Sequence, residues 1–217
     1  MKTDLQLQRD VVDELRFEPR VNDAEIAVSA KGGVATLAGA VSSYAQKRAA
    51  QRAAERVSGV HAVADDLAVK LPGDLTRTDT EIAHAAVTTM SWDAEVPADR
   101  IKVRVENGFI TLDGTTEWNF QKTAAERAVR YLSGVRGVYN AIVVSPKVSA
   151  TDVKAKVESA LKRSAELDAQ RITVEAADGT VTLKGRVRSW IERQDAERAA
   201  WAAPGVKMVH DQLLVSA

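Results

Sequence analysis

The side chains best suited to catalysis or metal binding are few in this sequence. There are three histidines (His61, His84 and His210) and no cysteine among the 217 residues. Without thiols the chain has no disulfide, no thiolate ligand and no cysteine nucleophile. The sequence also lacks a nucleophile elbow, a phosphate-binding P-loop and a His-Glu-x-x-His motif. It therefore predicts a protein that is not an enzyme and has no catalytic residue, no cofactor and no metal.

One arginine recurs along the chain, as Arg52, Arg127 and Arg198, at intervals of 75 and 71 residues. Such an arginine can form an ion pair, pack its alkyl stem over an apolar surface, or bind an anion. An arginine kept in all three copies of a repeated fold is more simply explained by a structural contact in each copy than by a ligand site in each copy. We therefore favour a structural role for them.

Aromatic residues make up only 5% of the chain and gather in two kinds of position. Some lie between a predicted strand and the helix after it, and others lie just after a predicted first helix (Tyr44, Trp118, Phe120 and Trp190; Phe17 and Trp92). Two interpretations stay open. The rings either cover the hydrophobic core or are exposed for contact with a bilayer or a protein partner.

Trp190 has the most basic surroundings of these aromatics, with four cationic residues near it in sequence (Lys184, Arg186, Arg188 and Arg193). Each cation next to an anionic membrane surface contributes about 1 kcal/mol, and Glu192 and Asp195 subtract from this attraction. Solvated strand and loop charge explains the cluster equally well. The candidate surface for anionic phospholipid or a protein partner comprises Trp190, Arg186, Arg188, Arg193, Trp118 and Trp92.

A threefold internal repeat decides how these residues are positioned. The segment Gly33–Gly39 recurs at Gly108–Gly114 and Gly179–Gly185, and the same offsets align three copies of 67 residues without internal gaps. The predicted domains are residues 3–69, 78–144 and 149–215. The first two carry a net charge of −2 each and the third carries +1. The connections between them are short.

Each repeat predicts the same order of elements. A Thr or Ser capping box at Thr3, Thr78 or Ser149 opens an amphipathic helix. Two alternating strands follow, joined by Gly-Gly, Asn-Gly or Asp-Gly, the pairs typical of tight hairpins. An alanine-rich helix, from about Gln46 in the first repeat, and a last strand complete the unit.

The fold class is therefore α+β, with three tandem α-β-β-α-β modules, each with two helices packed on one face of a three-stranded mixed sheet. In each repeat we expect one glycine in the hairpin, one where a side chain would strike a packed helix, and one at the C′ position of the second helix. These structural glycines are Gly33, Gly39 and Gly59; Gly108, Gly114 and Gly134; Gly179, Gly185 and Gly205.

This order, together with the Ile-x-Val strand and the Gly-x-Val/Ile-x-Leu-x-Gly hairpin, resembles the BON (bacterial OsmY and nodulation) domain family. The middle repeat matches best, through Ile101–Val103, Gly108–Gly114 and Gly134–Asn140. Asp65 and Asp211 stand where the family favours Asn. The resemblance implies a non-enzymatic protein of osmotic or envelope stress that binds phospholipid or another partner. A scaffold or chaperone-like protein that self-associates through its modules is the alternative.

Composition narrows the partners and the location. Thirty basic residues balance 30 acidic ones, which argues against nucleic acid as a partner, and a homo-oligomer stays open. No apolar run is long enough to span a membrane. The first 15 residues carry four acidic side chains and do not form a secretory signal. The chain as given is thus expected in the cytoplasm, or in the periplasm if a signal has been removed.

Overall fold

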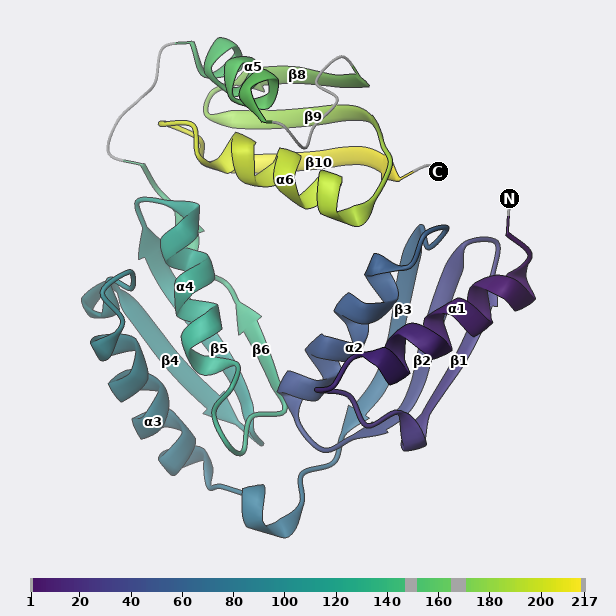
Figure 1. The fold of residues 1–217 in the computed structure, drawn as a ribbon. Helices are drawn as coiled ribbons and strands as arrows, with labels where there is room; N and C mark the ends of the chain where they lie inside the picture. The colour runs from purple at the N-terminus through teal and green to yellow at the C-terminus, as the bar shows by residue number, and fades with distance from the viewer. Residues whose placement is uncertain (1, 147–151, 165–170, 216–217) are drawn as a thin grey trace. The chain divides into compact units, whose positions relative to one another are not determined.

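The computed structural model describes residues 2–146, 152–164 and 171–215. Within them lie six α-helices and three mixed β-sheets (Figure 1), which confirms the predicted α+β class. By contact the chain divides into two compact units, Met1–Asp113 with Ala124–Ala141, and Gly114–Thr123 with Ile142–Ala217. The boundary between the units passes through strand β5 (Phe109–Thr116) and helix α4 (Asn119–Val129). The sheets, rather than the units, therefore follow the sequence repeat.

The first repeat forms one sheet of order β1-β2-β3, in which β1 and β2 are antiparallel and β2 and β3 are parallel. On β2, Ala35 and Leu37 are fully buried while Val34 on the opposite face is exposed. The buried face packs against apolar residues of both helices. Both helices therefore cover one face of the sheet, and the other face is open. The elements are α1 (Asp4–Phe17), β1 (Ile26–Lys31), β2 (Val34–Val41), α2 (Tyr44–Arg56) and β3 (Ala62–Val69).

The second repeat departs from the prediction in its last strand. The strand expected through Val138, Ile142 and Val144 is split in two, and both pieces pair in parallel with β5. At the break the Ala141 N–H still donates to the Leu112 carbonyl at 2.8 Å. The elements are α3 (Asp79–Trp92), β4 (Ile101–Glu106), β5 (Phe109–Thr116), α4 (Asn119–Val129), β6 (Gly137–Asn140) and β7 (Val143–Val144).

The third repeat returns to an unbroken three-stranded sheet of order β10-β9-β8. Its core joins Val157 and Leu161 of the first helix, Val181 and Leu183 of the central strand, and Ala196 of the second helix. The elements are α5 (Val153–Arg163), β8 (Ile172–Ala177), β9 (Thr180–Val187), α6 (Trp190–Trp201) and β10 (Met208–Val215).

Helix starts follow the capping chemistry. The capping boxes predicted at Thr3 and Thr78 are both present, and the backbone and side-chain hydrogen bonds from Thr78 lower the pKa of Glu81. The third predicted box rests on Ser149, which lies outside the described residues. The second helices begin earlier than predicted, because Ser43 and Ser189 accept N–H bonds and act as their N-caps.

The three hairpins have the predicted backbone. Gly33, Gly108 and Gly179 have φ of 82°, 80° and 81°, so their predicted positive φ is confirmed. The residue before each glycine, which is Gly32, Asn107 or Asp178, also has positive φ. Both central positions of a type I′ turn require this.

The reason expected for Gly39 and Gly185 was wrong. A Cβ built at Gly39 would lie 2.0 Å from the Glu25 carbonyl oxygen, and one at Gly185 would lie 2.0 Å from the Arg171 carbonyl oxygen. The obstacle is thus the backbone just before the first strand and not a packed helix. Because Gly39 pairs with Ile26 and Gly185 with Ile172, this close approach sits at the start of each antiparallel pair.

The glycines after the second helices do not lie at C′. Helix α2 ends at Arg56 with Val57 as its C-cap, so Gly59 is two residues further on. It is the third residue of a turn closed by the Val60 N–H on the Val57 carbonyl. The same turn closes from Val135 to Leu132 and from Val206 to Ala203, which gives Gly134 and Gly205 their positive φ.

Candidate functional site

The predicted cluster around Trp190 lies on consecutive elements of the third repeat. Arg186 is near the end of β9, Arg188 follows that strand, and Trp190 is the first residue of α6. One turn later Arg193 places its guanidinium 4.9 Å from the centre of the Trp190 ring, a cation–π contact. The structure therefore brings Arg193 against Trp190, whereas Arg186 and Arg188 are its neighbours along the chain.

Acidic side chains hold most of these cations. The Arg193 Nε lies 2.6 Å from Asp211 Oδ2, the Arg188 Nε lies 3.5 Å from Glu192 Oε2, and Lys184 pairs with Glu175 at 2.7 Å. Arg186 is exposed and has no ion pair within the described part of the chain. Trp190 itself is only partly exposed. The positive charge available to a ligand is consequently smaller than the sequence suggests.

The most exposed aromatic rings lie elsewhere. Trp92 and Phe17 are the last residues of α3 and α1, equivalent positions in two repeats, and are 86% and 83% exposed. Trp118, which directly precedes α4, is 36% exposed. Trp92 and Trp118 thus belong to the middle repeat and Trp190 to the third. The sequence marked Trp92 as a candidate, but its exposure was decided only by the fold.

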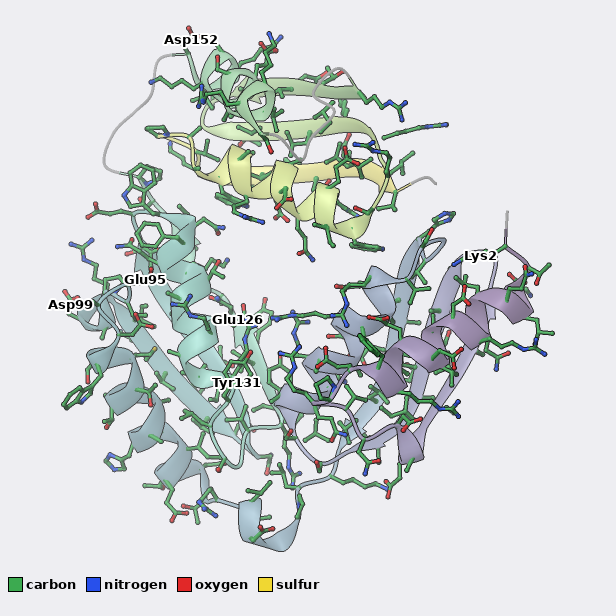
Figure 2. The ribbon with its side chains drawn as sticks, viewed as in Figure 1. Lys2, Glu95, Asp99, Glu126, Tyr131 and Asp152 are labelled. Carbon is green, nitrogen blue, oxygen red and sulfur yellow. The ribbon has the colours of Figure 1, made fainter. Side chains whose placement is uncertain are left out.

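The recurring arginines form the expected ion pairs in two of three repeats. The Arg127 guanidinium lies 2.7 Å from Glu95, which raises the pKa of Arg127, and Arg198 pairs with Asp195. Figure 2 labels Glu95 in the middle repeat. A structural role for Arg127 and Arg198 is therefore supported by direct contacts.

A carboxylate on the last strand was not recognised from sequence as an ion-pairing site. Asp65 pairs with Lys47 at 3.3 Å, and Asp211 pairs with Arg193 at the equivalent position. Each aspartate also accepts a backbone N–H, from Leu67 and Leu213 respectively. The departure from Asn at Asp65 and Asp211 was the available signal, because an acid facing a basic helix residue forms an ion pair.

The histidines do not converge. His61 lies over the hairpin glycine Gly33, and His84 lies on α3 beside Val87. His210 lies on β10 in the third repeat. Among residues 2–146, 152–164 and 171–215, no group of three His, Asp or Glu side chains could hold a metal ion. Of the helices that the structure describes, none is long and apolar enough to cross a bilayer.

The decisive comparison is with protein families. The family model described as BON domain matches residues 3–70, 78–146 and 149–217. The chain belongs to the BON domain family. The resemblance inferred from the hairpin glycines and the Ile-x-Val strand is therefore confirmed, in three tandem copies.

Known relatives of this BON protein include one curated sequence. The osmotically-inducible protein Y of Escherichia coli (strain K12) is 32% identical over 129 residues, which are 55% of this chain and 62% of that protein. The match thus spans less than two thirds of the relative's length.

Two solved structures of CdsD, a structural protein of the type III secretion system of Chlamydia trachomatis, also match this BON protein. The first is 15% identical and aligns with 96% of this chain and 91% of its own. The second is 13% identical and aligns with 100% of both chains. Their TM-scores are both 0.27, so they carry no argument about this chain.

Proposed function

We propose that this BON protein is a non-enzymatic, osmotic-stress-associated protein that binds anionic phospholipid surfaces peripherally. The observation that carries the proposal is the pair Phe17 and Trp92, each at the end of a first helix and more than four-fifths exposed. A large ring held in water at equivalent positions of two repeats is typical of a contact residue, because it does not contribute to the core. Its match to an osmotically-inducible protein supports the stress association.

The Trp190 cluster is the second contact surface in this proposal. Arg186 and Arg188 are exposed beside a tryptophan, in the one repeat with a net positive charge. Their attraction for an anionic surface decays within a Debye length of about 8 Å at physiological salt. Binding through this surface is therefore weakened by salt, whereas insertion of Trp92 is not.

Co-sedimentation with phosphatidylglycerol vesicles, at low and high salt, tests the proposal. The double variant Phe17→Ser and Trp92→Ser should lose most of its binding at both salt concentrations. The triple variant Trp190→Ala, Arg186→Ala and Arg188→Ala should lose the salt-sensitive part. Tyr131→Ser is the matched control, because this ring is 58% exposed but follows the second helix of its repeat. Wild-type protein that stays in the supernatant at low salt would contradict the proposal.

Self-association is the alternative, and one observation favours it. Phe109 and Tyr139 are 56% and 70% exposed on the open face of the middle sheet, and the Phe109 ring lies directly over Gly137. Light scattering coupled to size exclusion distinguishes the two functions. A dimer that is lost in the variant Phe109→Ser and Tyr139→Ser would support a scaffold role.

The domain boundaries and the compartment belong to the same proposal. We expect residues 3–69, 78–144 and 149–215 to fold as three units, so limited proteolysis should cut first within 70–77 and 145–148. A chain without cysteine is compatible with a reducing or an oxidising compartment. The proposed function therefore holds for the cytoplasm and for the periplasm.

A further inference from the structure

A carboxylate joins the first helix to the hairpin in two of the three repeats. In the first repeat, Asp4 Oδ1 accepts the Gly32 N–H at 2.9 Å. In the second, the two oxygens of Asp79 accept the N–H groups of Asn107 and Gly108, both at 2.8 Å. The hairpin amides and the first turn of the helix thus hold an anionic group between them.

A basic side chain accompanies this anion-binding arrangement in every repeat. A Cβ at the hairpin glycine would meet the His61 ring in the first repeat and the stem of Arg136 in the second. In the third repeat it would meet the stem of Lys207, at 3.1 Å. The side chain of a basic residue therefore passes over the same turn whose amides bind the carboxylate.

The third repeat keeps the turn and its basic residue, but none of its described carboxylates accepts a hydrogen bond from the turn. The gapless repeat places Ala150 at the position of Asp4 and Asp79. Within the described residues, no acceptor contacts the N–H groups of Asp178 and Gly179, although Gly179 has the same φ as its counterparts. Figure 2 labels Asp152 at the start of α5, where this residue makes no capping hydrogen bond.

A pocket of about 460 Å³ lies at this place, lined among others by Lys154, Asp178, Gly179 and Lys207. The lining contains two lysines and two aspartates, Asp152 and Asp178, so its formal side-chain charge is balanced. Lys154 also lies 3.8 Å from Glu158. The amides of Asp178 and Gly179, which have no acceptor in the described part of this repeat, therefore decide what binds. Where the other repeats supply their own carboxylate, this repeat offers the same donors to an external group.

We propose that this hairpin notch of the third repeat, formed by the amides of Asp178 and Gly179 with Lys154 and Lys207, binds the phosphate group of a ligand. Two of its oxygens take the places that the Asp79 oxygens occupy in the second repeat. Phosphate is preferred over a carboxylate because its additional charge and oxygens reach the two lysines. The inference does not rest on the proposed membrane function, since free phosphate and a lipid headgroup present the same chemistry.

Titration of the full chain with inorganic phosphate, followed by ¹⁵N NMR, tests the notch. The amides of Asp178 and Gly179 should shift and saturate at a concentration on the order of millimolar. The amides of Asn107 and Gly108, which a carboxylate already occupies, should not shift. Equal shifts at Gly108 and Gly179 would overturn the proposal, because they would indicate a general effect of salt.

In the aligned sequences Ala150 stands where Asp4 and Asp79 stand, so we expect the variant Ala150→Asp to compete for the same amides and to weaken phosphate binding at least about tenfold. Ala150→Asn is the matched control, similar in size but uncharged, and should retain most of the binding. In the opposite direction, Asp79→Ala should create phosphate-dependent shifts at Asn107 and Gly108. Unchanged phosphate binding in Ala150→Asp would refute the notch.

Vesicles distinguish the two sources of phosphate. If the ligand is a lipid headgroup, Ala150→Asp should bind phosphatidylglycerol vesicles more weakly than Ala150→Asn does. If both variants bind vesicles equally while only Ala150→Asp loses inorganic phosphate, the ligand is a free phosphate compound. If the wild type does not bind vesicles but the Asp178 and Gly179 amides still shift with phosphate, only the membrane proposal is wrong. The two proposals can therefore be tested independently.

Discussion

The first and third repeats build the same sheet from different helix starts. In the first, Thr3 and Gln6 cap α1, and Asp4 ties the helix to the hairpin. In the third, α5 begins at Val153 after Asp152, whose φ is 72°, and the hairpin amides have no acceptor in the described residues. Both repeats nevertheless keep the close backbone approach at Gly39 or Gly185, and the strand carboxylate paired with a basic residue of the second helix. The module thus folds with or without the hydrogen bond between the first helix and the hairpin, whereas both repeats require a glycine at the position of Gly39 and Gly185.

The largest expected effect comes from filling this glycine site. Gly39→Ala and Gly185→Ala should each cost about 4 kcal/mol, because a Cβ 2.0 Å from a carbonyl oxygen adds overpacking to the strain of positive φ. Hydrogen exchange, resolved for each repeat by NMR, would measure the loss. Gly73→Ala is the control, since nothing lies within 4 Å of its Cβ. If Gly185→Ala leaves the third repeat stable while Gly39→Ala destabilises the first, the two glycines do not have the same role.

The hairpin glycines should separate the two repeats. A Cβ at Gly179 would lie 2.9 Å from the Gly205 carbonyl oxygen, whereas one at Gly33 would meet the movable ring of His61. Gly179→Ala should therefore cost about 2–3 kcal/mol and Gly33→Ala about 1 kcal/mol, most of it backbone strain. Denaturant unfolding followed at each repeat checks the order. If Gly33→Ala and Gly179→Ala lower the free energy of unfolding equally, the His61 ring does not move aside for the added Cβ.

Removing the connection between helix and hairpin should make the first repeat behave like the third. Asp4→Ala loses one charge-assisted hydrogen bond near the surface, which contributes about 1 kcal/mol. Asp79→Ala should cost more, because Asp79 accepts two N–H groups. Faster exchange of the Gly32 amide in Asp4→Ala is the direct readout. Unchanged exchange at Gly32 would argue against the hydrogen bond.

The smallest effect concerns acid stability and should appear in the first repeat alone. Hydrogen bonds from Arg20, opposed by burial, lower the pKa of Glu18 to about 2, and Arg56 adds a further contact at 3.3 Å. Because the folded pKa lies below the usual value, this stability is present above about pH 4.5 and is lost as pH falls toward 2.

The third repeat has Ser164 at the position of Glu18 and lacks this dependence. Since Arg20 is largely exposed, solvent screening limits the effect to about 1 kcal/mol. Thermal unfolding between pH 4.5 and 2 should therefore be less steep in Glu18→Gln. If the unfolding temperature of Glu18→Gln falls with pH as steeply as that of the wild type, the Glu18 carboxylate does not cause the loss of stability in acid.

Much of the fold was predictable because it rests on local rules. Gly33, Gly108 and Gly179 could be assigned to hairpins since only a few residue pairs adopt positive φ twice in succession. The contrast between Asp4 and Ala150 was also visible in the aligned repeats, but only the distance from Asp4 to the Gly32 amide shows what the aspartate does. The exposure of Trp92 was not predictable, because a ring at the end of a helix can fold over the core or point away from it.

The sequence by itself determined the family, the three repeats, their α+β class and the turns, because these depend on spacing, capping and backbone preference within a few residues. The tertiary structure alone decided why Gly39 and Gly185 are glycines, which cations near Trp190 are held by acids, and which hairpin amides have no acceptor among the described residues. The contacts of Gly39 with Glu25 and of Arg193 with Asp211 join residues that are well separated along the chain. Their separation is fixed only when helix, hairpin and last strand pack around one core.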